Sequence, residues 1–470
     1  MPARLTRRTP KFPSGIVHFG PGAFFRAFNA VYTAEAGGWG ITAVSLQSPT
    51  ARDQLMPQDG VYIAVTLAPG GPQYRVIESI NAVLVAPEDP EAVLAAMNDP
   101  GVHIVSLTIT EKGYCHEPAT GRLRLDDPGI AADLANPSQP RTAPGFLLEA
   151  LARRRASGAA PFTVLTCDNL PHNGRLARGV VLDFARARDA GLADWIATNV
   201  HFPATMVDRI TPATTPADVA ALRAAHSYDD PGCVMHEPFR QWVIEEFSGP
   251  RPAWERVGAQ IVQDVAPFET MKLRCLNGTH SALAYLGYLA GHETIAETVA
   301  DAPFAALCRH LWDHEILPTL ATPEGEDLPA YTRALLARYG NPAIRHRTWQ
   351  IAMDGSQKLP QRLLGTVADN LAAGRPIPGL ALAVAGWMRY VGGIDEKGEL
   401  IEVKDPLATR LRVAVDSAAT PAAKVAALLA IADVFPATLA NDETFCTAVT
   451  SAYQGLCDKG AHTMVKELTA

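Results

Sequence analysis

The sequence lacks the excess of basic residues that a protein acting mainly on nucleic acid needs. Its 470 residues include 41 lysines and arginines against 49 aspartates and glutamates, a formal net charge of −8. Nucleic-acid binding generally requires a basic surface that displaces counterions, so we expect no nucleic-acid partner. A small anionic substrate is not excluded, because a few local cations suffice to bind one.

The cysteines lack the spacing of a disulfide framework or a thiolate zinc site. There are seven, an odd number, and no two have the C-x-x-C spacing. This usage indicates a reducing compartment. Two His-Glu pairs begin like the zinc motif H-E-x-x-H, but its second histidine is replaced by Ala296 in one and by Pro318 in the other. We therefore expect no metal, and a metal hydrolase is disfavoured.

Long apolar runs are also missing. No run approaches the ~20 residues of a membrane helix, and the N-terminal residues lack the apolar region of a secretory signal. With 48% hydrophobic and 19% charged residues, the chain is globular rather than disordered. We expect a cytoplasmic protein with no membrane partner and about two or three domains.

The first half of the chain alternates strand and helix patterns. A short apolar strand at 15–19 runs into Gly20-x-Gly22, a helical pattern covers 23–36, and a second apolar strand covers 41–46. This order predicts a βαβ unit. Further strands are predicted at 62–66, 74–80, 102–109 and 162–166.

The second half is rich in alanine and leucine and contains few strand signals. We therefore predict a Rossmann-type, doubly wound α/β domain over residues 1–265 and a mainly α-helical domain over residues 266–470. Helices are expected at 281–290, 304–311, 331–337, 381–390 and 421–432.

The glycine turn fits part of a dinucleotide-binding fingerprint. Gly20 and Gly22 match the first two glycines of G-x-G-x-x-G, but Phe25 stands at the third. The turn alone leaves a nucleotide site and an ordinary strand-to-helix turn equally open, and the strand that follows favours the nucleotide site. After that strand, Gln47 offers a partner for a ribose hydroxyl and Arg52 one for a 2′-phosphate, so the choice between NAD and NADP stays open.

Two polar loops follow predicted strands at their carboxyl ends, where open α/β sheets bind ligands. They read T-I-T-E-K-G-Y at 108–114 and C-D-N-L-P-H-N-G at 167–174. The same residue types are also common in ordinary turns.

The stretch M-K-L-R-C-L-N-G-T-H-S at 271–281 is the most informative. On an α-helix, Lys272 and His280 would lie about 80° apart around the axis and about 12 Å along it, and Asn277 would neighbour His280. A lone lysine on a helix is usually a solvated charge. Here its neighbours are apolar, and desolvation would lower its pKa and suit it as a base.

This stretch, K-x-R-x-L-N-G-x-H-S, resembles the signature of the mannitol dehydrogenase family, the polyol-specific long-chain dehydrogenases that need no zinc. The resemblance extends over nearly the whole chain and includes the glycine turn and both polar loops. It also includes V-D-R-I-T-P at 207–212, E-P-F-R-Q-W-V-I-E at 237–245 and D-G-S-Q-K-L-P-Q-R at 354–362. It implies a Rossmann-type domain, a helical domain and a site between them.

The resemblance also implies residue roles. The general base would be Lys272, with the amides of Asn169 and Asn277 at the reacting oxygen and His280 orienting the substrate. Asp208 and Lys358 would line the substrate pocket. The cofactor, NAD with NADP not excluded, would contact Gly20, Gly22, Ala23, Phe24, Gln47, Thr110 and Glu111. The sequence departs from the family in one run, which reads F-F-R-A-F-N at 24–29 instead of F-H-R-A-H-Q.

The motifs at 44–50, 352–364 and 391–407 are most similar to the fructuronate reductase branch, which interconverts D-fructuronate and D-mannonate. Five cationic side chains near the pocket motif suit a carboxylate, although such groups often form ordinary ion pairs. We assign Lys358 and Arg347 to substrate binding; the other three are Arg345, His346 and Arg362.

The runner-up is a neutral-polyol dehydrogenase of the mannitol or arabinitol type. A non-enzymatic nucleotide sensor is disfavoured, because a sensor needs no base such as Lys272. The partner is thus a sugar acid or a polyol, and the resemblance suggests a monomer.

Overall fold

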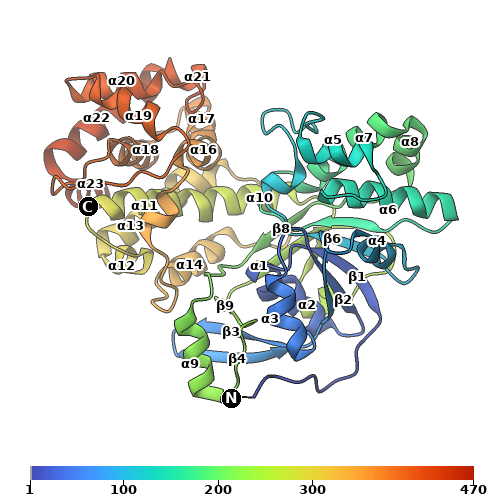
Figure 1. The fold of residues 1–470 in the computed structure, drawn as a ribbon. Coiled ribbons are helices and arrows are strands. Elements are labelled where there is room, and N and C mark those ends of the chain that lie inside the picture. Colours follow the sequence, from blue (N-terminus) through green and yellow to red (C-terminus); the bar gives the residue numbers. More distant parts are fainter. Residues whose placement is uncertain (1–2) are drawn as a thin grey trace. The chain divides into compact units, whose positions relative to one another are not determined.

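The computed structural model describes residues 3–470. The chain divides into two compact units, residues 1–266 and residues 267–470, and each is described by itself. Unit 1 is an α/β unit and unit 2 is built of helices (Figure 1). The predicted fold class is therefore confirmed.

The main sheet of unit 1 has five parallel strands in the order β5-β2-β1-β6-β7. This is a Rossmann-type order: the chain moves from β1 to one side and then returns to β6 on the other, leaving a crevice at the carboxyl ends of β1 and β6. The strands are β1 (Ser14–Phe19), β2 (Gly40–Ser45), β5 (Ile80–Val85), β6 (Ile104–Leu107) and β7 (Thr163–Thr166).

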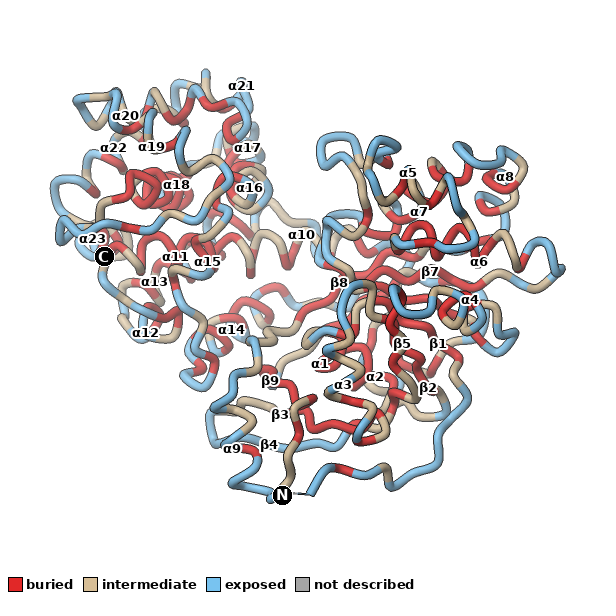
Figure 2. The backbone as a smooth tube through the Cα atoms, viewed as in Figure 1, coloured by how far each residue is buried: buried red, intermediate tan, exposed pale blue. Residues whose placement is uncertain are grey.

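Helices cover both faces of this sheet. Val17 and Phe19 of β1 pack into the core under α4 (Pro90–Asn98), α6 (Ala143–Ser157) and α7 (Asn173–Arg188). Ile16 points to the opposite core, because successive strand residues face opposite sides. Figure 2 shows β1 and β7 of this sheet as buried segments. Further α-helices of the unit are α1 (Ala23–Ala27), α2 (Asn29–Ala36), α3 (Thr50–Leu55), α5 (Pro128–Ala135), α8 (Ala190–Asn199) and α9 (Pro216–His226).

Two predicted elements were wrong in their extent. The helix expected over 23–36 is interrupted at Phe28, whose φ of −126° and ψ of −83° are not helical. At this break in the helix, the Phe28 ring packs against the rings of Tyr32 and Trp242. The strand expected over 74–80 is two strands, because β4 (Gly71–Ile77) ends before β5 begins at Ile80.

Unit 1 also has two three-stranded sheets that the sequence did not predict. One has the order β4-β3-β9 and the other β11-β10-β8. Their strands are β3 (Tyr62–Ala68), β4, β8 (Thr205–Asp208), β9 (Val234–His236), β10 (Gln241–Glu245) and β11 (Gln260–Val262).

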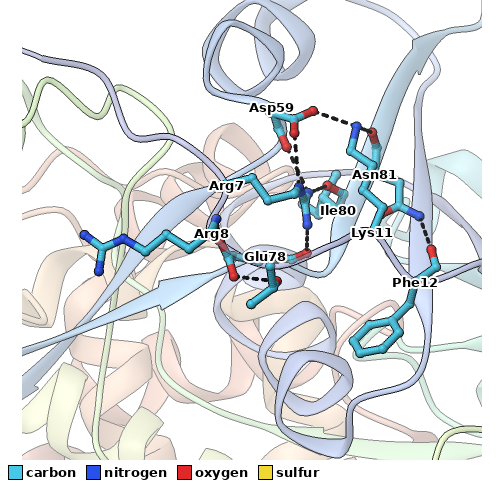
Figure 3. A network of polar contacts seen from close by, with 9 residues as sticks. Arg7, Arg8, Lys11, Phe12, Asp59, Glu78, Ile80 and Asn81 are labelled. Atoms are coloured by element: carbon cyan, nitrogen blue, oxygen red, sulfur yellow. Dashed lines mark hydrogen bonds and ion pairs between the residues drawn. The ribbon is translucent and has the colours of Figure 1, made fainter.

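The segment that precedes β1 is held against the main sheet by polar contacts (Figure 3). The Arg7 guanidinium donates to the carbonyl oxygens of Asp59, at 2.9 Å, and Ile80, at 2.5 Å. Lys11 forms an ion pair of 2.6 Å with Asp59 and donates to the carbonyl of Asn81. These contacts fix the N-terminal segment beside the start of β5.

Unit 2 is built around α11 (Thr279–Leu289), which packs against α15 (Thr348–Ala352) and the apolar α18 (Pro378–Val391). No helix among residues 3–470 combines the length and the apolar character required to cross a membrane. The other α-helices are α10 (Ala266–Met271), which begins on the last residue of unit 1, α12 (Ile295–Ala300), α13 (Ala302–His310), α14 (Leu328–Tyr339), α16 (Gly355–Leu359), α17 (Gly365–Ala372), α19 (Ala408–Asp416), α20 (Pro421–Leu429), α21 (Ala437–Ala440), α22 (Glu443–Lys459) and α23 (Ala461–Thr469).

Candidate active site

The predicted base lies on a π-helix, η4 (Lys272–Gly278), rather than on an α-helix. Side chains from elsewhere in unit 2 bind the carbonyls of this widened turn. Trp312 Nε1 donates to the Cys275 carbonyl at 3.0 Å, and the Tyr339 hydroxyl donates to the Leu276 carbonyl at 2.7 Å. Such external partners offset the loss of regular α-helical bonds, and single π-turns occur frequently at functional sites.

The π-turn changes which side chains share a face. On an α-helix, residues five apart would be separated by about 140° around the axis. A π-helix is bonded between residues i and i+5, so Asn277 returns to the side of the helix that carries Lys272. Lys272 is buried, with 8% of its surface exposed. The π-turn thus places the amine of Lys272 and the amide of Asn277 on the same side of the helix.

His280, on the first turn of α11, is surrounded by aromatic rings and cations. Its ring stacks on Tyr339 at a centroid distance of 5.2 Å and lies 5.0 Å from the ring of His346. Burial lowers the pKa of His280 well below its usual value, and the nearby positive charges lower it further. The imidazole is therefore neutral near pH 7.

We call the cationic side chains around His280 the cation cluster; its members are Arg338, Lys358 and Arg362. His346 lies beside them, and burial lowers its pKa, so its imidazole is neutral near pH 7. Burial lowers the pKa of Lys358 to about 8, and its ammonium donates to the Met353 carbonyl. Arg362 Nη1 donates to Ser281 Oγ at 3.1 Å.

A close backbone approach holds the segment of Arg362 next to η4. A Cβ at Gly278 would come within 2.8 Å of the Arg362 carbonyl oxygen. Only glycine lets this segment, η7 (Pro360–Leu364), lie so near the turn that carries Lys272. Gly278 thus connects the cation cluster to the predicted base.

Arg347 lies apart from the cation cluster. Its guanidinium is 3.6 Å from Glu293, and its side chain is 57% exposed. It lines a cavity of about 300 Å³ together with Tyr288, His292 and Trp349. The substrate-binding role of Arg347 stays a prediction, and Arg345 is also exposed.

In unit 1, the glycine turn fits a bound dinucleotide. Gly20 has a φ of +93°, and a Cβ there would come within 2.1 Å of the Thr108 carbonyl oxygen, so this position requires glycine. A Cβ at Gly22 would meet nothing nearer than the Gly20 oxygen, at 4.0 Å. This open space beside the turn leaves room for a phosphate group to approach the backbone.

The missing third glycine is explained by packing. The Phe25 ring is buried and stacks on His18 at a centroid distance of 3.6 Å. His18 in turn bonds Ser106 Oγ at 2.8 Å and Thr108 Oγ1 at 2.9 Å, and burial lowers its pKa to about 3. Phe25 therefore belongs to the core below the turn. His18 was not predicted from the sequence, in which its place within an apolar strand is the one signal.

The other predicted residues of unit 1 lie near strand ends. Ala23 and Phe24 begin α1 and are partly buried, and Gln47 is exposed after β2. The exposed residues Thr110, Glu111 and Asn169 follow β6 and β7, and Asp208 is buried at the end of β8. Sequence reasoning missed Arg338 and Tyr339 of unit 2, because α14 reads as an ordinary amphipathic helix.

Comparisons with known proteins identify the family. The model of the mannitol dehydrogenase Rossmann domain matches residues 14–256, and that of the mannitol dehydrogenase C-terminal domain matches residues 264–457. The chain therefore belongs to the mannitol dehydrogenase family, which confirms the resemblance found in the sequence. It is an oxidoreductase of this family.

Similar proteins cover nearly the whole chain. The chain is 49% identical to the "uncharacterized oxidoreductase YdfI" of Escherichia coli, over 96% of this chain and 94% of that protein. It is 47% identical to the D-mannonate oxidoreductase of E. coli, over 97% of this chain and 96% of that protein. A solved structure of Pseudomonas fluorescens mannitol 2-dehydrogenase, a ternary complex with NAD and D-mannitol, is 40% identical with a TM-score of 0.85, covering 99% of this chain and 96% of that one.

Among residues 3–470, no group of three or more His, Cys, Asp or Glu side chains is arranged to hold a metal ion.

Proposed function

We propose that this oxidoreductase interconverts a keto sugar acid and the corresponding hydroxy acid, with D-fructuronate and D-mannonate as the pair and NAD as cofactor. The observation that carries the proposal is the cation cluster. Three cationic side chains lie close enough to His280 to lower its pKa: Arg338, Lys358 and Arg362. A substrate carboxylate is complementary to such a group.

The similarity to the E. coli D-mannonate oxidoreductase supports the same choice. The similarity to the P. fluorescens mannitol 2-dehydrogenase supports a neutral polyol as the second candidate. A neutral polyol would offer the cation cluster no carboxylate, whereas a sugar acid adds one that charge-assisted hydrogen bonds can hold. The sugar acid therefore accounts better for the residues of unit 2.

In the proposed mechanism, the uncharged amine of Lys272 takes the hydroxyl proton when the hydroxy acid is oxidised and returns it during reduction. Bound nicotinamide supplies the hydride chemistry. Asn277, on the same side of η4, donates an amide hydrogen bond to the reacting oxygen, and neutral His280 orients the substrate. The role of Asn169 stays a prediction from the family resemblance.

The proposed function is tested by following nicotinamide absorbance when the protein is mixed with NAD and D-mannonate. Reduction of NAD is expected, together with oxidation of NADH when D-fructuronate is added. No absorbance change with any uronate, ketose or polyol would contradict an enzymatic role and favour the nucleotide sensor.

We predict a preference for NAD over NADP. Arg52, the cation that the sequence offers for a 2′-phosphate, is ion-paired with Asp53 at 3.0 Å and with Glu88. The two carboxylates outnumber the guanidinium, and like charges near a phosphate oppose its binding. We expect kcat/KM for NADH to exceed that for NADPH at least about 10-fold, a typical effect of one charge pair.

The Asp53→Asn/Glu88→Gln variant should have a higher kcat/KM for NADPH, which lowers the ratio of kcat/KM for NADH to that for NADPH. Arg153→Gln, which breaks the ion pairs of Arg153 with Glu91 and Glu149 elsewhere in unit 1, serves as the control. An equal use of both cofactors by the wild-type protein would contradict the prediction.

A second prediction concerns pH. Burial lowers the pKa of Lys358 to about 8, so its ammonium is charged below that pH and loses its charge above it. The kcat/KM for D-fructuronate should therefore fall, relative to that for D-fructose, as the pH rises through about 8. Any pH effect of Lys272 acts on both substrates, so it cancels when kcat/KM for D-fructuronate is divided by kcat/KM for D-fructose. A constant ratio between pH 6.5 and 9.5 would rule out Lys358 as the carboxylate partner.

A further inference from the structure

Thr110, in the loop after β6, has a backbone conformation that is nearly restricted to glycine. Its φ is +63° and its ψ is 167°. Side chains with a branched β-carbon almost never adopt a positive φ, and this region of backbone space is strained for all residues except glycine. Such strain persists only where the surrounding structure enforces it, and it concentrates at functional sites.

The carboxylate of Asp168 enforces this conformation. Its Oδ1 accepts the Thr110 N–H at 2.8 Å, and its Oδ2 accepts the Ile109 N–H at 3.1 Å and the Tyr114 hydroxyl at 2.8 Å. Asp168 and Tyr114 are 8% and 2% exposed. Three donors therefore converge on one buried carboxylate that comes from a different strand end, two residues after β7.

Asp168 is itself held in place. Asn173 Nδ2 donates to the Asp168 carbonyl at 2.9 Å and to the Thr205 carbonyl at 2.8 Å. The Tyr114 hydroxyl also bonds Thr166 Oγ1 at the end of β7. The Asp168 carboxylate is thus held in one position, and its hydrogen bonds determine the backbone conformation of the loop after β6.

The strained loop lies against the glycine turn. Thr108 Oγ1 donates to the Gly20 carbonyl at 2.8 Å, and the Thr108 carbonyl oxygen occupies the space that a Cβ of Gly20 would need. This contact lies between β1 and β6, at the crevice where Rossmann-type sheets bind dinucleotides. Thr110 and Glu111 follow directly on the exposed side of the loop.

We infer that Asp168 is a positioning residue for the cofactor: by holding Thr110 in its strained conformation, it sets the loop at 108–111 against the glycine turn. The inference rests on the proposed function only in taking the cofactor to be NAD. Asp168 is buried under the loop and acts through the backbone of Ile109 and Thr110.

Unit 1 provides a matched control. Asp133 is equally buried, and its carboxylate accepts the N–H groups of Arg141, at 2.8 Å, and Thr142, at 3.0 Å, and the Thr142 hydroxyl, at 2.7 Å. It therefore makes the same kind of clamp, at the start of α6, away from the glycine turn. The variants Asp168→Asn and Asp133→Asn remove comparable interactions.

The test is calorimetric titration of each variant with NADH, without any sugar, alongside its thermal unfolding. Asp168→Asn should raise the Kd for NADH at least about 10-fold, the loss expected for a charge-assisted hydrogen-bond clamp. Asp133→Asn should leave the Kd for NADH within about 2-fold of the wild-type value. It should lower the unfolding temperature about as much as Asp168→Asn does. Adding Thr110→Gly to Asp168→Asn should recover most of the affinity, because glycine adopts the conformation without strain.

An unchanged Kd in Asp168→Asn, an equal loss in Asp133→Asn, or the absence of recovery by Thr110→Gly would each overturn the inference. If Asp168→Asn does not fold, Tyr114→Phe removes one donor of the clamp. It should raise the Kd about 3-fold or more, and an unchanged Kd would then overturn the inference. Failure of the wild-type protein to bind NADH would instead contradict the proposed cofactor.

Discussion

The Lys272→Met variant should lose nearly all turnover while still binding NADH. Methionine keeps the length and apolar character of the buried stem but cannot exchange a proton. General acid–base catalysis contributes about 100-fold to 10,000-fold to a rate, so kcat should fall by that order for both oxidation and reduction. Steady-state rates measure the loss of turnover, and an NADH titration on the same sample measures whether cofactor binding is retained.

Lys466→Met is the matched control, because Lys466 is an exposed lysine on α23 of the same unit. Its kcat should stay within about 2-fold of the wild type, as expected of a surface substitution. Near-normal turnover in Lys272→Met would contradict the assignment of Lys272 as the general base.

The Lys358→Met variant should lose its sugar-acid activity selectively. A hydrogen bond to a charged group contributes about 1.5–3 kcal/mol, so kcat/KM for D-fructuronate should fall about 10-fold to 100-fold. The value for D-fructose should change far less, since a neutral ketose carries no carboxylate. The two substrates are measured on the same preparation at pH 7, where the Lys358 ammonium of the wild type is charged.

Lys404→Met controls for the loss of a lysine in unit 2. The Lys404 ammonium lies 4.4 Å from the centre of the Trp349 ring and 3.7 Å from Glu402. It lies outside the cation cluster and should affect both substrates equally. A parallel loss of both activities in Lys358→Met would indicate a structural role for Lys358 instead.

The sequence predicted the elements whose signals are local. The apolar strand at 15–19 followed by the glycine turn corresponds to β1 and the positive φ of Gly20, because both depend on neighbouring residues. The alanine- and leucine-rich stretches of the second half correspond to α11, α13, α14, α18 and α20. The division of the first half into one large and two small sheets depends on pairing between distant strands, which local patterns do not encode.

The sequence offered candidate residues for the site, but it did not indicate their geometry. The apolar flanks of Lys272 indicated its burial. The π-turn that moves Asn277 to the side of Lys272 depends on Trp312 and Tyr339, which follow it by dozens of residues. In the same way, the clamp of Asp168 on Thr110 joins two loops that each resembled an ordinary turn.

The most direct test of the account compares kcat/KM for D-fructuronate, D-fructose and D-xylulose, each with NADH and with NADPH. We predict that D-fructuronate with NADH is the best pair, by at least about 10-fold over either neutral ketose, as expected for one charge-assisted carboxylate contact. A kcat/KM for D-fructose above that for D-fructuronate would contradict the account and indicate a neutral-polyol dehydrogenase.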